Sequence, residues 1–148
     1  MKTFPALFLA AGLLALAGCA ERGPEIGPRH DVKVRVEMKI PFSTDYNWSF
    51  QAMDEYKGTQ QPLASNSGRG GYHYESFEHN EGNMAAGHVL TTAGSLSPGS
   101  SRAGALPSTV YISMKIVVDG DVKADTTINS LMPTNSSGGR EAKLRVTL

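Results

Sequence analysis

The sequence predicts an all-β protein, an antiparallel two-sheet sandwich that follows an N-terminal signal helix. Apolar and polar residues alternate over residues 31–40, 109–118 and 142–148, and a period of two is typical of strands with one buried and one solvated face. Asp119-Gly120 joins the second of these runs to a further alternating run. Because Asp and Gly tolerate positive φ, this pair predicts a hairpin with a type I′ turn.

Weaker patterns predict the remaining strands. Tyr46, Trp48, Phe50 and Ala52 alternate with polar residues and predict a second strand. Shorter strands are expected at 71–78, 85–93 and 122–128, the last completing the hairpin. Segments rich in Gly, Ser, Pro and Asn predict loops at 58–71, 94–107 and 129–139.

These elements amount to about seven strands, with no helical period after the leader. One apolar face per strand favours two antiparallel sheets packed face to face. We therefore expect an immunoglobulin-like sandwich over residues 31–148, with a small barrel as the alternative. The chain has one Cys, so apolar packing must hold the sheets together without an intrachain disulfide.

The first 18 residues predict a secretory signal peptide. Lys2 supplies a positive start, and an almost wholly apolar run follows before Glu21. This run is about fifteen residues long, whereas a membrane-spanning helix needs about 20 apolar residues. Cleavage is therefore favoured over a permanent span.

Leu16-Ala17-Gly18-Cys19 resembles the bacterial lipobox at all four positions. The resemblance implies a bacterial lipoprotein that is cut between Gly18 and Cys19. It also implies a diacylglycerol thioether on the Cys19 sulfur and a fatty acyl chain such as palmitate on the new amine. Two or three acyl chains give stable anchoring, so the expected partner is a membrane. An ordinary signal peptide with an incidental Cys is the alternative.

The residues that follow the predicted cleavage site indicate a flexible tether and a cellular location. Residues 19–30 contain Gly23-Pro24 and Gly27-Pro28, which disfavour a helix or a buried strand. His30 closes this tether, and we expect it to be inert. Ala20 stands where Gram-negative lipoproteins retained at the inner membrane commonly have Asp. By that resemblance, the expected location in a Gram-negative cell is the outer membrane, facing the periplasm.

The densest group of possible metal ligands comprises His73, His79 and His88, with Glu75, Glu78 and Glu81 among them. Imidazole and carboxylate groups bind zinc and copper. The spacing of these residues matches no established ligand pattern, and a solvated polar loop explains the segment as well. We therefore expect no tight metal site and no cofactor.

Composition and motifs favour a binding or accessory module over an enzyme. The chain has 14 Lys and Arg against 14 Asp and Glu, which excludes nucleic-acid binding by bulk charge. It contains no G-x-S-x-G nucleophile motif. The leading expectation is a non-enzymatic, lipid-anchored cell-envelope protein with an envelope protein as its possible partner. The alternative is an envelope zinc- or copper-binding protein that uses the segment from His73 to His88.

Overall fold

The computed structural model describes residues 27–41, 45–69, 73–100 and 105–148 of the chain, with side chains for all but 73–75. The predicted signal helix, the lipobox and the tether as far as residue 26 lie outside the described residues. The described part contains eight strands: β1 (Arg29–Ile40), β2 (Tyr46–Tyr56), β3 (Thr59–Arg69), β4 (His73–Ala85), β5 (His88–Pro98), β6 (Tyr111–Val118), β7 (Asp121–Ile128) and β8 (Arg140–Thr147).

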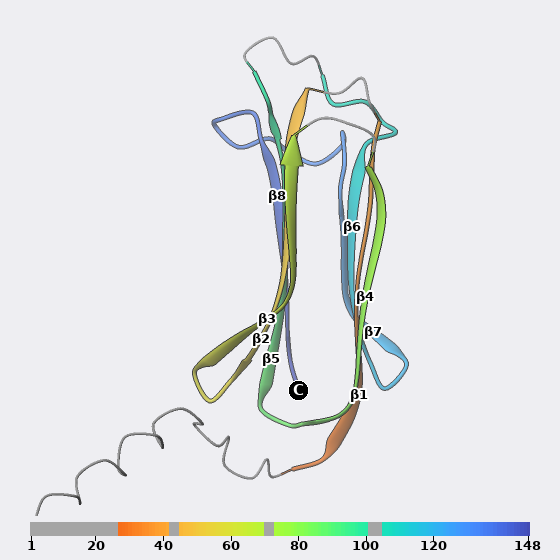
Figure 1. Cartoon of the computed structure of the whole chain (residues 1–148), viewed down its shortest axis with the longest axis vertical. Coiled ribbons are helices and arrows are strands. Elements are labelled where there is room, and N and C mark those ends of the chain that lie inside the picture. Colours follow the sequence, from red (N-terminus) through yellow and green to blue (C-terminus); the bar gives the residue numbers. More distant parts are fainter. Residues whose placement is uncertain (1–26, 42–44, 70–72, 101–104) are drawn as a thin grey trace, which may run out of the picture.

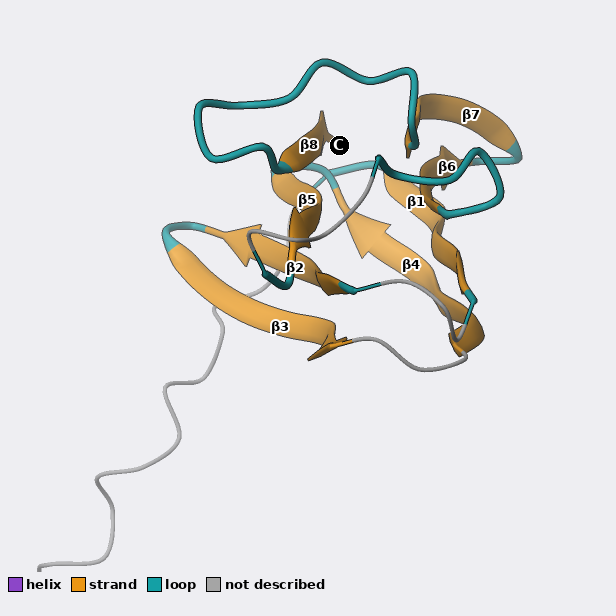
Figure 2. Cartoon of the chain, turned by 90° about the horizontal axis from the view of Figure 1, so that it is seen from above, coloured by secondary structure: helices purple, strands orange, loops and turns teal. Residues whose placement is uncertain are grey.

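The strands form two four-stranded sheets that face each other (Figures 1 and 2). Sheet A has the strand order β4-β1-β6-β7, and sheet B has the order β3-β2-β5-β8. All neighbouring strands are antiparallel. The predicted all-β, two-sheet sandwich is confirmed, with eight strands rather than about seven.

The core lies between the sheets and follows the predicted alternation. β1 and β6 bury every second residue completely or nearly so, and their inward side chains are Val, Ile and Met. One core cluster joins residues of both sheets and includes Trp48, Phe50 and Leu96 of sheet B. A second cluster surrounds Val34, Leu90 and Ile116. The aromatic residues of β2 are therefore core residues.

The prediction of a loop at 58–71 is wrong, because residues 59–69 form the edge strand β3. β3 pairs with β2 alone, and the register shifts between Ala52 and Met53, opposite Pro62. An edge strand can hold a Pro because only one of its sides needs backbone donors. β3 is also exposed along most of its length, so it lacks the apolar alternation on which the prediction depended.

Two further loop predictions fail for related reasons. Gly94–Pro98 continue β5 instead of starting a loop. Gly94 faces the core, where a Cβ would lie 3.2 Å from both Ile128 Cδ1 and Met114 Sδ. The segment around His79 and Glu81 belongs to strand β4, not to a solvated loop, and β1 begins at Arg29 rather than at residue 31.

Tight turns and long connections gather at opposite ends of the sandwich (Figure 1). The turns Lys57-Gly58 and Asp119-Gly120 have positive φ, the latter at 54° and 84°, which confirms the predicted hairpin. The chain enters β1 at this same end, where Ala86 N donates to Pro28 O over 3.1 Å. We call this end the turn end. Residues 105–110 and 129–139, which precede β6 and β8, lie at the other end, which we call the loop end.

We predict that Gly68→Ala destabilises the domain. A Cβ at Gly68 would lie 2.6 Å from Cζ2 of the buried Trp48 ring, so the indole must move, which costs about 1–3 kcal/mol in a packed core. The control is Gly82→Ala on β4, where the nearest atom would be 4.0 Å away. Denaturant unfolding followed by Trp48 fluorescence measures both changes. Equal stability of the two variants would contradict this packing.

Candidate functional site

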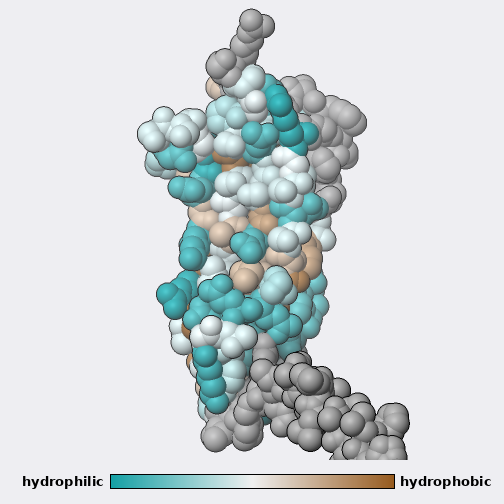
Figure 3. Space-filling view, turned by 60° about the vertical axis from the view of Figure 1, so that its left-hand side comes forward, coloured by the Kyte–Doolittle hydropathy of each residue, from teal (hydrophilic) through white to brown (hydrophobic). Residues whose placement is uncertain are grey.

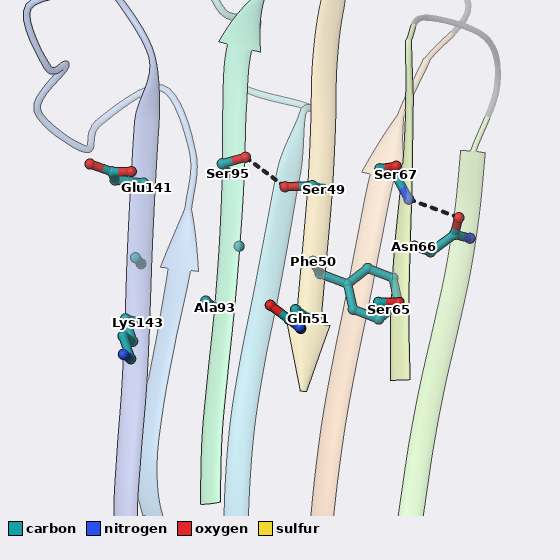
Figure 4. A pocket seen from close by; sticks show the side chains of 12 residues that line it. Ser49, Phe50, Gln51, Ser65, Asn66, Ser67, Ala93, Ser95, Glu141 and Lys143 are labelled. Carbon is teal, nitrogen blue, oxygen red and sulfur yellow. Dashed lines mark hydrogen bonds between the residues drawn. The ribbon is translucent and has the colours of Figure 1, made fainter. Parts of the chain in front are cut away.

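The outer face of sheet B carries a hollow of about 810 Å³. Four neighbouring strands line it, and most of its side chains are short and polar (Figure 4). The residues that reach it from the outer face are Ser49, Gln51, Ser65, Ser67, Ala93, Ser95, Glu141 and Lys143. Phe50 also borders it from below, but its ring packs into the core.

The hollow exists because the central strands carry short side chains where β8 carries long ones. Ser49 Oγ and Ser95 Oγ lie 2.8 Å apart on the floor, hydrogen-bonded across β2 and β5. Glu141 and Lys143 stand on the edge strand β8 and form one rim (Figure 4). In Figure 3, which brings this side of the molecule forward, pale and brown residues occupy the middle and hydrophilic teal residues the margins.

A second hollow of about 260 Å³ continues the first toward the turn end. The two share Gln51, Ala93 and Lys143. Its lining is the more polar of the two, because Glu55, Lys143 and Arg145 stand around Met53 and Val89. Together the two hollows form one trough, which we call the sheet B trough, with serine hydroxyls at one end and charged side chains at the other. Such a surface suits a ligand held by hydrogen bonds from both neutral and charged groups.

A buried hydrogen bond between Asp54 and His88 lies between the sheets near the turn end. His88 Nδ1 is 2.8 Å from Asp54 Oδ1 and 3.0 Å from Oδ2, and both side chains are almost fully buried. The Tyr56 ring stacks on the imidazole at a centroid distance of 4.3 Å. No local sequence pattern signals this pair, because 34 residues separate its members.

The three candidate metal-ligating histidines are not brought together. His73 and His79 lie on the same strand, six residues apart, which corresponds to about 20 Å at strand geometry. His88 lies on the other sheet and faces Asp54. His79 Nε2 instead lies 3.1 Å from Glu81 Oε2. Within the described ranges, no three His, Cys, Asp or Glu residues form a group that could hold a metal ion.

His30 lies in β1 rather than in the predicted tether, and its Nδ1 is 2.8 Å from Asp119 Oδ2. The other oxygen of Asp119 accepts the Asp31 backbone N–H over 2.9 Å. These hydrogen bonds hold the pKa of Asp119 below its usual range, and the one from His30 has the larger effect. They fix the hairpin turn to the start of β1 at the turn end.

The outer face of sheet A is charged, in contrast to that of sheet B. Arg35 Nε donates to Glu78 Oε2 over 2.8 Å, and Lys33 Nζ lies 3.2 Å from Glu78 Oε1. Together with a hydrogen bond from Asn80, these donors lower the pKa of Glu78 to about 2, Arg35 contributing most. This face is therefore neutralised by its own ion pairs.

Comparison with known proteins gives no relative from which a function could be taken. No protein-family model, no curated protein sequence and no solved structure matches the chain significantly. Over the residues for which the structure gives a description, no helix has the length and apolar character to cross a membrane.

We predict that Asp54→Ala destabilises the domain by about 3–5 kcal/mol, because it leaves a buried imidazole without its carboxylate. His88→Ala should cost a similar amount. If the two groups act as one pair, the double variant should be much less unstable than the sum of the single variants. Urea unfolding of the four proteins completes the cycle. Additive losses would contradict the pairing.

We predict that Glu78 titrates with a pKa of about 2, below its ordinary value of 4.5. A lowered folded-state pKa gives stability that is present above the ordinary value and lost as pH falls toward 2. Arg35→Gln should return the titration midpoint toward 4.5 and narrow that acid-sensitive window. NMR titration of the Glu78 carboxyl carbon in the original chain and in the variant measures the shift. An unchanged midpoint in Arg35→Gln would contradict the assigned cause.

Proposed function

We propose that the chain is a lipid-anchored protein of the bacterial cell envelope whose β-sandwich is a non-enzymatic binding module. Cys19 carries the anchor after cleavage behind Gly18. In a Gram-negative cell the domain stands on the outer membrane and faces the periplasm. The bound partner is another component of the envelope, and it contacts the outer face of sheet B.

The sheet B trough is the observation that supports binding. Charged sheet faces such as that of sheet A satisfy their own groups through ion pairs. The trough instead presents hydroxyl and amide groups on strands that backbone pairing keeps rigid. Preorganised polar groups around a concavity are typical of ligand sites. Two of its four serines, Ser49 and Ser95, hydrogen-bond to each other.

The position of the chain entry supports the anchoring. The described chain begins at the turn end, where Ala86 N donates to Pro28 O, and residue 27 follows Cys19 by eight positions. Eight extended residues span at most about 29 Å. A lipid on Cys19 therefore keeps the turn end near the membrane and leaves the trough accessible along the side of the domain.

We predict that mass spectrometry of the membrane fraction finds an N-terminal peptide beginning at Cys19 with added acyl mass. Cys19→Ala should accumulate as an uncleaved precursor, because the thioether forms on the missing sulfur. Ala20→Ser is the matched control and should be processed normally. A soluble mature chain with an unmodified Cys19 would contradict the proposed lipid anchor.

We predict that a photo-crosslinking residue in place of Ala93, at the centre of the trough, couples the full chain to an envelope component in intact cells. The same residue in place of Ser113, on the outer face of sheet A, is the control. Crosslinking at equal yield from both positions, or from neither, would contradict a binding role for the trough.

A further inference from the structure

The charged end of the sheet B trough carries two basic residues on the same face of one strand. Lys143 and Arg145, which we call the basic pair, are both exposed and line the trough from the edge strand β8. They are two positions apart, which places their Cα atoms about 7 Å from each other. Neither forms an ion pair with the part of the chain that the structure describes. No carboxylate of the described chain therefore offsets their mutual repulsion.

The residues opposite the basic pair are small and uncharged. On sheet A, Arg35 stands directly opposite Glu78 in the register of β1 and β4 and donates to it over 2.8 Å. On sheet B, the residues of β5 that stand opposite the basic pair are Ala93 and Thr91. Both line the same hollow as the basic pair. Because their side chains are short, space for a ligand group remains beside the two cations.

The two carboxylates of the trough lie away from this space. Glu141 stands opposite Ser95, at the hydroxyl end. Glu55 stands on β2 opposite Val89, two strands from β8, and accepts a hydrogen bond from Gln60 Nε2 over 3.4 Å. An anionic group would be repelled at the hydroxyl end and on the β2 side of the charged end. The space beside the basic pair is where the trough attracts it.

The hydroxyl end of the trough suits a different part of a ligand. Ser49 and Ser95 form its floor, and Gln51 and Glu141 lie beside them (Figure 4). Hydroxyl and amide groups both donate and accept hydrogen bonds, whereas an ionised carboxylate only accepts them. Ligand hydroxyls match this set, because they too donate and accept. Since Ser95 lies four positions from Thr91 on β5, about 13 Å along the strand, a ligand that reaches both ends is larger than a simple anion.

We propose that the sheet B trough binds an acidic saccharide. Its anionic group, a carboxylate or a phosphate, lies between Lys143 and Arg145, and its hydroxyl groups contact the serine end. The planar guanidinium of Arg145 can bind either group through two parallel hydrogen bonds, and Lys143 adds a second positive charge. The inference deepens the proposed function and rests on it for the location of the ligand in the cell envelope.

The first test measures saccharide binding to the purified full chain by calorimetry, in non-ionic micelles of a detergent without sugar groups. The three probes are a tetrasaccharide of hexuronic acid, a phosphorylated hexose tetrasaccharide and the same hexose tetrasaccharide without phosphate. We expect at least one acidic probe to bind at least ten times more tightly than the neutral probe. The binding should weaken as salt is added, because salt screens exposed charges. Similar affinities for all three probes, or no binding, would overturn the proposal.

The second test removes the basic pair. Lys143→Gln with Arg145→Gln should weaken binding of the acidic probe at least tenfold. The matched control, Lys115→Gln with Lys123→Gln on β6 and β7 of sheet A, removes the same net charge away from the trough and should bind like the original chain. Trp48 fluorescence checks that both variants are folded. Equal losses in the two variants, or no loss in either, would overturn the site and leave the basic pair with a role in edge protection alone.

The third test asks whether the hydroxyl end takes part. Ser49→Ala with Ser95→Ala should weaken binding of the acidic tetrasaccharide at least threefold, because the ligand hydroxyls lose their partners. Inorganic phosphate should bind the original chain at least ten times more weakly than the acidic tetrasaccharide. Phosphate binding of equal affinity, or an unchanged affinity in the serine variant, would reduce the trough to a simple anion site and overturn the proposal.

Two further probes represent other classes of anionic ligand, and failure of the saccharide differs from failure of the proposed function. Tighter binding of a hexa-aspartate peptide, or of vesicles with anionic phospholipid, would overturn the saccharide assignment. If Ala93 crosslinks to an envelope component but no acidic saccharide binds, the binding module is supported and the ligand class is wrong. If the saccharide binds through the basic pair but Cys19 carries no lipid, the anchoring is wrong and the ligand class is supported.

Discussion

Burial of two apolar inner faces, without a crosslink between them, is the constraint on which the whole sandwich depends. The chain's single Cys, Cys19, lies outside the described residues, so no intrachain disulfide joins sheet A to sheet B. Full burial of a Val, Leu, Ile or Met side chain contributes about 1.5–3 kcal/mol. The central strands β1, β6, β2 and β5 supply most of the fully buried side chains. Their close packing explains why Gly94 and Gly68 have no room for a Cβ.

Asp54 and His88 are polar residues buried in this apolar interior, so they need hydrogen-bond partners within the protein. A polar group taken from water into a core costs free energy unless it is hydrogen-bonded. The carboxylate and imidazole meet each other, and Tyr56 covers the imidazole face. The pair also disfavours a slipped register, because a one-residue slip of β2 would move Asp54 to the solvent face and leave His88 buried without its carboxylate.

The elements predicted from sequence are those whose burial is one-sided. β1, β6 and the Asp119-Gly120 hairpin follow from alternation and turn chemistry, because each strand has one face in the core. β3 escaped prediction because most of it is exposed and only Leu63 and Ala64 pack against the core, which is too few residues to produce an alternating pattern. The trough escaped it for another reason. A hollow made of serines on three strands depends on their register, which no local pattern records.

The edge strands β3 and β4 are protected from pairing with other chains in different ways. On β4, Glu78 is held by Arg35 and Lys33 of the neighbouring strand, so its charge stabilises the sheet and also guards its edge. On β3, Arg69 is the one charged residue, and Pro62 beside a register shift interrupts the row of backbone donors. Pro and irregular pairing both disfavour the addition of another strand. The backbone of β3 therefore protects its edge in the way that charge protects the edge of β4.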